Sequence, residues 1–457
     1  MNRFRQALPL DLLRSRGSSS SQRWWVTTLV VMTALVEFVE VWRLTSAYER
    51  PPMAPDAGVF QHIGWHLTNG GRLYVDVWEP KLPLPFETTA ILSLIAGDDM
   101  YLYQYLNVGL MVLAVIGIVL LVGTLTHQLT DDPFASTVAG FSMLLLPGFA
   151  IRPAYGFKAK YLLLFTGLLA IYLLLNDYPF ASGVAAAASV GYWQLGAIFP
   201  LLVVGLALHR SDWRTVGAVV LGGGVFTVVM LAPTVVLWQS TSEMVAQVVL
   251  IPMLADDSAR FFERLVAGVV HFKWASPFVL LGVYGLLRGV RDQLSREDWW
   301  LLVGAGWFGF VILFVDFDVG GYTDLIPGLA FVAIGIGLLS TKLTTERLRY
   351  ALTAALVSVV VLNVVAFGSV GLVFPATDTP APVAMDDLRT NERALELSAV
   401  PDDTHDVRYY YWNREVPETC HYRLSLMEVH WLQSVGSGDL SGCSDLQEVR
   451  AVQRGGG

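Results

Sequence analysis

Charged residues are scarce in this chain of 457 residues: 15% of its residues are charged and 54% are hydrophobic. Soluble domains carry roughly 25% charged and about 45–50% apolar residues. A soluble protein of the present composition would expose too much apolar surface to stay dispersed. The composition therefore excludes an ordinary soluble enzyme and predicts a polytopic membrane protein, with membrane lipid as its surroundings.

Lysine is rarer still, with only five residues in the chain, and the net charge is −9. This balance argues against a nucleic-acid partner, which requires a clustered basic face. Aspartate outnumbers glutamate 24 to 15, and an Asp-rich, Lys-poor composition is typical of proteins from high-salt surroundings. A GC-rich genome would also favour arginine over lysine, so the composition indicates a halophile without requiring one.

Cysteine occurs twice, at Cys420 and Cys443, and both residues fall in the last 83 residues. This segment, 375–457, holds 14 acidic residues and 7 arginines, so its charge density exceeds that of the rest of the chain. We therefore expect a membrane domain over 1–374 and a small acidic domain over 375–457. The two cysteines are compatible with one disulfide in an oxidising compartment, or with two unpaired thiols.

Long apolar runs recur along the first domain at the length needed to cross about 30 Å of hydrocarbon. They lie at 24–44, 103–126, 134–150, 160–176, 214–238, 265–287, 299–315, 322–341 and 349–373. One further run, 179–208, suits either a single tilted helix or two short helices that form a hairpin.

Basic residues decide between these alternatives, because cytoplasmic loops are enriched in Lys and Arg. Only the hairpin keeps the basic segments 288–298 and 342–348 on the same side as the arginines of residues 1–23. The sequence thus predicts an all-α polytopic membrane protein with about eleven transmembrane helices. Its N-terminus is expected in the cytoplasm and residues 375–457 outside the cell membrane.

The first external segment, 45–102, gathers groups that suit acid–base chemistry. Carboxylates stand at Asp56, Asp76 and Glu79. A short helix between them would place His62 and His66 on one face, since they are four residues apart. Positioned carboxylates and imidazoles can move protons in a reaction, although a solvated loop with ordinary ion pairs would have the same composition.

The order of residues over 55–84 resembles the first external loop of the GT-C glycosyltransferases. An aspartate follows the first span, then a short glycine-containing helix, then Gly-x-x-Tyr-x-Asp-x-Trp-x-x-Lys-x-Pro-Leu from Gly71 to Leu84. The GT-C enzymes are membrane transferases that use polyprenyl-phosphate sugars. The acidic, Lys-poor composition narrows the resemblance to haloarchaeal dolichyl-phosphate-mannose mannosyltransferases of S-layer N-glycosylation.

This resemblance implies an inverting mannosyltransferase that uses dolichyl phosphate mannose as donor and a glycan or glycoprotein hydroxyl as acceptor, on the extracytoplasmic face. It implies that Asp56 is the catalytic base, with Asp76 and Glu79 as alternates. The family's aspartate is usually followed by glutamate, whereas Ala57 follows here, so a second carboxylate must come from elsewhere or be absent. The expected substrate-binding residues of this loop are His62, His66, Tyr74, Trp78 and Lys81.

A second group of residues supports a donor that carries phosphate. Arg152, Lys158 and Lys160 place three cations within nine residues of another external loop, against the positive-inside trend. Arginine grips phosphate in bidentate fashion and lysine offers a compact charge. We therefore expect all three to bind substrate, with attraction to anionic lipid head groups as the alternative.

Other functions and cofactors are less well supported. A flippase for lipid-linked sugars or a secondary transporter should show inverted repeats and polar groups at mid-bilayer, which this sequence does not display. No cofactor is expected. Asp316 and Asp318 have the spacing of a divalent-metal motif, which is the weaker alternative. Trp193 and Gln194, at the centre of the predicted hairpin, suit either an interfacial belt or a cavity lining.

Overall fold

The computed structural model describes nine stretches of the chain. They are residues 24–47, 53–75, 77, 79–97, 99–210, 212–250, 261–292, 296–315 and 322–370. Several predictions concern residues outside these stretches and stay predictions: the roles of Asp76 and Trp78, the metal pair Asp316 and Asp318, and the acidic domain 375–457 with its two cysteines.

The described residues form helices joined by short turns, and apart from an isolated bridge between Leu73 and Val77 they contain no β-structure. The α-helices are α1 (Trp24–Ala47), α2 (Pro55–Thr68), α3 (Leu84–Ala96), α4 (Met100–Thr130), α5 (Pro133–Ser142), α6 (Pro147–Ile151), α7 (Ala159–Leu175), α8 (Pro179–Tyr192), α9 (Ile198–His209), α10 (Trp213–Ala232), α11 (Thr241–Val245), α13 (Phe261–Phe272), α14 (Ser276–Asp292), α15 (Trp300–Phe310), α16 (Ile326–Ser340) and α17 (Glu346–Val370). Short 3₁₀ or π segments connect or extend them: η3 (Met143–Leu145), η4 (Arg152–Tyr155), η5 (Gln194–Ala197), η6 (Pro233–Leu237), η7 (Ala246–Leu250), η8 (Lys273–Ala275), η9 (Arg296–Trp299), η10 (Val311–Val315) and η11 (Tyr322–Leu325). The all-α prediction is confirmed.

Six of the helical segments in the described stretches are long and apolar enough to cross a membrane, or seven if the bent pair Pro133–Leu145 and Pro147–Tyr155 forms one span. Four shorter apolar helices accompany them, among them Ala159–Leu175 and Trp300–Val315. The chain is therefore a multi-pass membrane protein. The figure of eleven crossings stays a prediction. The predicted apolar runs agree with helical segments to within a few residues, except that the run 134–150 is divided between two helical pieces bent by 85°.

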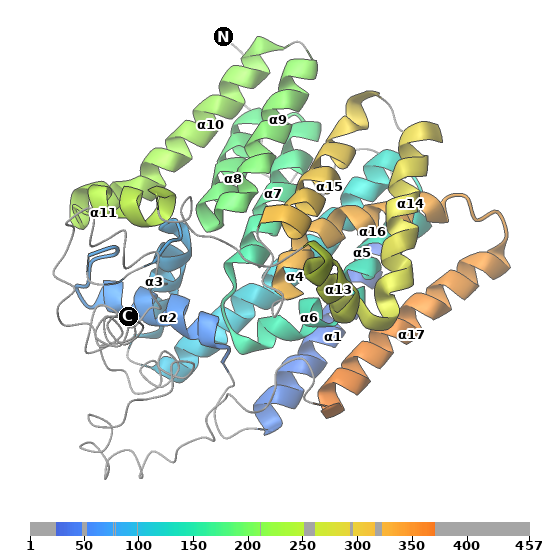
Figure 1. The fold of residues 1–457 in the computed structure, drawn as a ribbon, viewed down its shortest axis with the longest axis horizontal. Coiled ribbons are helices and arrows are strands. Elements are labelled where there is room, and N and C mark those ends of the chain that lie inside the picture. The colour runs from blue at the N-terminus through green and yellow to red at the C-terminus, as the bar shows by residue number, and fades with distance from the viewer. Residues whose placement is uncertain are drawn as a thin grey trace, which may run out of the picture.

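Several of these helices lie side by side, among them α8 with α10 and α14 with α16 (Figure 1). Glycines allow the close approach. A Cβ atom added to Gly183 of α8 would lie 1.9 Å from the Val219 carbonyl oxygen of α10, and one on Gly285 of α14 would lie 2.0 Å from the Gly335 oxygen of α16. Small residues at crossings allow backbones to pack without intervening side chains, which is how helices associate in lipid.

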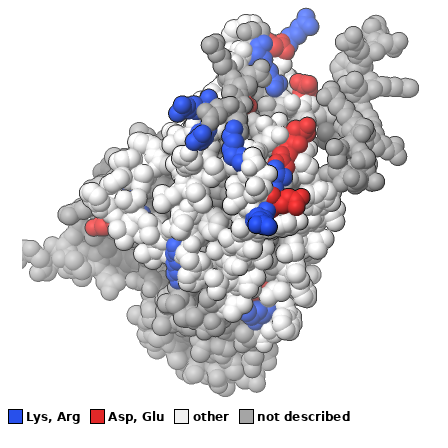
Figure 2. Space-filling model, turned by 90° about the vertical axis from the view of Figure 1, so that its right-hand side faces the viewer, with Lys and Arg blue, Asp and Glu red and all other residues white. Residues whose placement is uncertain are grey.

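The outward faces of the helices are apolar, as lipid contact requires. Val228 of α10 is 70% exposed and Leu280 of α14 is 72% exposed. Figure 2 shows one face of the molecule on which charged side chains gather mainly at one end and leave a broad uncharged area. A soluble protein would not leave such a surface uncovered.

The segment 179–208 is two helices, α8 and α9, which pack against each other. The break falls at Trp193, whose backbone is extended (φ −162°, ψ 134°), so the α-helix cannot continue through it. The prediction of two short helices in place of one tilted span is confirmed.

A second break brings distant residues together. The helical pair formed by α5–η3 and α6–η4 is bent by 85°, and Pro147 begins the second half. The bend carries η4 against the start of α2, where the Ala54 N–H donates to the Tyr155 carbonyl oxygen at 3.1 Å. The first turn of α2, η4 and the beginning of α7 thus share one corner of the bundle.

Candidate active site

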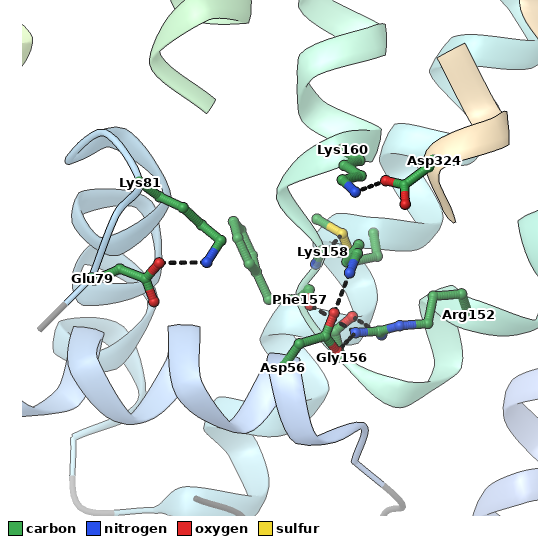
Figure 3. Close-up of polar contacts among 10 residues, drawn as sticks. Asp56, Glu79, Lys81, Arg152, Gly156, Phe157, Lys158, Lys160 and Asp324 are labelled. Carbon is green, nitrogen blue, oxygen red and sulfur yellow. Dashed lines mark hydrogen bonds and ion pairs between the residues drawn. The ribbon is translucent and has the colours of Figure 1, made fainter. Parts of the chain in front are cut away.

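Asp56 is the centre of a charged cluster at this corner (Figure 3). Its carboxylate accepts a hydrogen bond from Arg152 Nη2 at 2.5 Å and pairs through its other oxygen with the Lys158 ammonium group. The three residues come from the first turn of α2, from η4 and from the position just before α7. The structure therefore brings together the predicted base and two of the three predicted phosphate ligands.

Backbone carbonyls and a pair of glutamines fix the geometry of the cluster. Arg152 also donates to the carbonyl oxygens of Gly156, at 3.0 Å, and Phe157, at 3.3 Å. Gly156 has φ +96°, and a Cβ there would meet Gln61 Oε1 at 2.5 Å, so glycine is required by both conformation and space. Gln61 Oε1 accepts the Phe157 N–H at 3.2 Å, and its amide nitrogen donates to Gln104 Oε1 at 2.8 Å.

The cluster keeps Asp56 ionised. Burial by itself would raise the pKa of Asp56, but Arg152 and Lys158 outweigh it and hold the pKa below its ordinary value. Burial also lowers the pKa of the Lys158 ammonium group, with Asp56 opposing this effect and Arg152 adding to it. The Arg152 side chain is only 2% exposed, so Asp56 is the counter-charge that lets a buried guanidinium persist.

A second set of charges faces the same region. Lys81 pairs with Glu79, and its ammonium group lies 5.3 Å from the centre of the Phe60 ring and equally far from that of Trp193. Lys160 pairs with Asp324, in the turn that precedes α16. Figure 3 shows each of the three lysines directed at its own carboxylate, Lys81 at Glu79, Lys158 at Asp56 and Lys160 at Asp324. With Arg152, four cations and three carboxylates give this part of the fold an excess of positive charge.

The loop that carries Lys81 is held in place by polar contacts with distant segments. The Tyr74 hydroxyl donates to the Lys81 carbonyl oxygen at 2.7 Å, and Gln194 donates to the Pro80 oxygen at 2.7 Å. Gln247 donates to the Tyr74 oxygen at 2.8 Å and accepts from the Glu79 N–H at 3.0 Å. Tyr74, predicted to bind substrate, is thus buried and braces the loop, and its sugar-binding role stays a prediction.

The two histidines lie on α2, as their spacing predicted. His62 is buried with its ring 5.4 Å from that of Trp65. The ring of His66 lies against Gly71, where an added Cβ would be 2.1 Å from His66 Cδ2. These contacts concern packing of the first loop, and a role of either histidine in binding substrate stays a prediction.

Two carboxyl groups that were not predicted from the sequence lie in this part of the fold. Asp324 is 7% exposed and is the partner of Lys160. Its position at the head of an apolar span was the one available signal, because a carboxylate there requires a partner. Glu87, in the first turn of α3, has a buried Oε1 with no hydrogen-bond partner among the described residues, and burial raises its pKa to about 8.

An apolar cavity of about 520 Å³ opens between α8, α9 and α10. Among its lining residues are Leu82, Ala187, Val190, Val204, Met230 and Met244. Leu82, one of these lining residues, directly follows Lys81 in the chain. Such a cavity suits a hydrocarbon chain whose polar end reaches the lysines.

Known mannosyltransferases are similar in sequence to this chain. A family model described as DolP-mannose mannosyltransferase matches residues 70–232. A dolichol phosphate-mannose mannosyltransferase of Haloferax volcanii is 32% identical over 431 residues, which are 89% of this chain and 93% of that protein. The chain belongs to the dolichol phosphate-mannose mannosyltransferase family.

Solved structures show the fold of this mannosyltransferase family member to be that of the GT-C enzymes, as the first-loop resemblance predicted. ArnT from Cupriavidus metallidurans in the apo state aligns with a TM-score of 0.53 at 17% identity, over 74% of this chain and 63% of ArnT, which is less than two thirds of that protein. ArnT bound to undecaprenyl phosphate aligns with a TM-score of 0.55 at 15% identity, over 90% of this chain and 70% of ArnT.

Proposed function

We propose that the protein transfers a mannosyl unit from dolichyl phosphate mannose to a hydroxyl group of a glycan or glycoprotein acceptor, on the extracytoplasmic face of the cell membrane. The observation that supports this most is the double ion pair of Asp56 with Arg152 and Lys158, in the loop that follows the first span. A carboxylate beside two cations that can hold a phosphate is the arrangement that direct displacement at a sugar phosphate needs.

The reaction is a single displacement. The acceptor oxygen forms a bond to the anomeric carbon while the bond from that carbon to the phosphate oxygen breaks, and dolichyl phosphate leaves. The acceptor proton passes to the Asp56 carboxylate. Arg152 and Lys158 stabilise the charge that develops on the leaving phosphate, which is the role of fixed cations in such transition states. Lys81 and Lys160 hold the phosphate group in the donor and in the product alike.

Donor binding also prepares the base. In the free protein the pKa of Asp56 is held low by its two cationic partners, which makes its carboxylate a weak base. A phosphate bound at Lys158 and Arg152 pairs with the same two cations and so weakens their interaction with Asp56. The pKa of Asp56 therefore rises towards its ordinary value when donor is present. Proton acceptance is thereby coupled to occupancy of the donor site.

The dolichyl chain occupies the apolar cavity lined by α8, α9 and α10. The reason is that Leu82, which also lines this cavity, directly follows Lys81 in the chain. The site then lies at the extracytoplasmic ends of the spans. We propose that no divalent metal takes part, because four cations already face the phosphate region. Within the described residues no three His, Cys, Asp or Glu side chains gather as metal ligands.

Transfer of labelled mannose from dolichyl phosphate mannose to a glycopeptide, by protein purified in detergent, tests this function. We expect Asp56→Asn to lower the rate at least a hundredfold, since a base contributes about 10²–10⁴-fold. Asp131→Asn is the matched control, because the Asp131 side chain is fully exposed at the end of α4. Equal rates for wild type and Asp56→Asn would remove Asp56 from the chemistry. Movement of lipid-linked sugar across liposomes without transfer would overturn the enzyme assignment.

A further inference from the structure

Two lysines that come from separate parts of the chain lie over the ring of Trp193. Its ring centre is 4.5 Å from Lys160 Nζ and 5.3 Å from Lys81 Nζ. Both distances fall within the range of about 6 Å in which an ammonium group is attracted to an aromatic face, and tryptophan gives the strongest attraction. We propose that Trp193 is a positioning residue that holds Lys81 and Lys160 at the anion site for the phosphate of a lipid-linked sugar.

The two ammonium groups need such a residue because they repel each other. Each lysine has a carboxylate partner, Glu79 for Lys81 and Asp324 for Lys160, but these carboxylates lie on different elements. The electron-rich face of the Trp193 ring is the feature that both lysines share. It attracts both cations while adding no negative charge that would repel a phosphate.

The ring itself is fixed by the turn between α8 and α9. Gln194 donates to the Pro80 oxygen at 2.7 Å, and Trp307 Nε1 of α15 donates to the Leu195 oxygen at 3.4 Å. The Gly196 N–H donates to the Trp193 oxygen at 2.8 Å. The turn is therefore docked to the first loop and to α15 by groups other than the indole ring, so removal of the ring leaves these contacts in place.

This inference rests on the proposed function and adds a residue that acts through Lys81 and Lys160. Trp193 is half-buried, and its ring faces the cations of the site. Its expected effect is on the affinity for the phosphate group, since a misplaced lysine weakens binding of the anion in both the donor and the product. The effect on the chemical step at Asp56 is expected to be small.

The test compares Trp193→Leu with Trp193→Phe, and Trp213→Leu serves as control because Trp213 is 75% exposed at the start of α10. The measurements are kcat, the KM for dolichyl phosphate mannose, and inhibition by dolichyl phosphate and by uncharged dolichol. We expect Trp193→Leu to raise the KM and the inhibition constant of dolichyl phosphate about tenfold, as loss of two such contacts implies. Inhibition by dolichol and kcat should stay within about threefold, and Trp193→Phe should stay close to wild type because it keeps a ring.

Several outcomes would overturn the proposal. One is a fall in kcat of Trp193→Leu with an unchanged inhibition constant for dolichyl phosphate. Another is equal weakening of dolichol and dolichyl phosphate, which would indicate a role in binding the chain. If Trp193→Leu fails to fold, a Trp193→Phe variant that loses dolichyl phosphate affinity tenfold also refutes the positioning role.

The same variants separate this inference from the transferase assignment. Direct binding of a fluorescent dolichyl phosphate needs no acceptor and no turnover. If wild type binds it, and Trp193→Leu binds it about tenfold more weakly, the role of Trp193 at the anion site is supported even when no mannose is transferred. If all variants bind it equally, the inference fails while mannosyl transfer is unaffected.

Discussion

The guanidinium of Arg152 offers a sharp test of the charged cluster, through the substitution Arg152→Lys. The arginine makes three hydrogen bonds at once, to Asp56 and to the carbonyl oxygens of Gly156 and Phe157. A lysine keeps the charge but lacks the planar fork, so it can replace the bond to Asp56 and not the two carbonyl bonds. Each bond to a charged group contributes about 1.5–3 kcal/mol, so about 3 kcal/mol is lost at the lower limit.

If this loss is expressed at the reacting centre, kcat/KM falls about a hundredfold or more, since each 1.36 kcal/mol is a factor of ten. The assay is mannose transfer at several donor concentrations, with the thermal unfolding midpoint measured in parallel. Arg210→Lys is the matched control, because Arg210 is 30% exposed and lies 3.7 Å from the exposed Asp177. An Arg152→Lys protein that is folded and within threefold of wild type would refute the reasoning.

Three further predictions concern other parts of the molecule. Glu87→Gln should raise the unfolding midpoint relative to wild type at pH 9 but not at pH 5. The pKa of Glu87 is raised to about 8 in the folded protein, so the wild type loses stability as pH rises from about 4.3 towards that value. Equal differences in midpoint at both pH values would contradict this prediction. Ala187→Phe should raise the KM for a long-chain donor several-fold and that of a short-chain donor less, since Ala187 lines the apolar cavity. Equal increases in KM for both donors would show that the cavity does not bind the dolichyl chain. Prolonged dialysis against EDTA should leave the transfer rate unchanged, and a loss restored by Mg²⁺ or Mn²⁺ would refute metal independence.

Hydropathy was sufficient to predict most of the long helices of the membrane domain, but it indicated one span over 134–150 where the structure has two helical pieces bent by 85°. The run 160–176 became α7, and the run 349–373 became α17, because a span's length is set by bilayer thickness and its composition by lipid. The short helix around His62 was also predictable, from local spacing. The helix α3 was missed, since residues 84–96 form a shorter apolar run within a segment taken as a loop.

The cations of the site could be predicted from sequence, but their partners could not. Arg152 and Lys158 stood out because basic residues at that position break the usual charge bias of loops. The pairing of Lys160 with Asp324 joins residues 164 positions apart in the chain, and Gln247 reaches Glu79 from a similar distance. Such pairs depend on how helices pack, and neither periodicity nor composition specifies which helices become neighbours.

The stoichiometry of the reaction shows whether the protein moves mannose from a dolichyl phosphate donor. Purified protein, a glycan acceptor and doubly labelled dolichyl phosphate mannose allow transferred mannose and released dolichyl phosphate to be counted together. We expect one dolichyl phosphate to be released for each mannose transferred, and no transfer from GDP-mannose. Transfer from the nucleotide sugar, or passage of the intact donor across a bilayer with no dolichyl phosphate released, would contradict it.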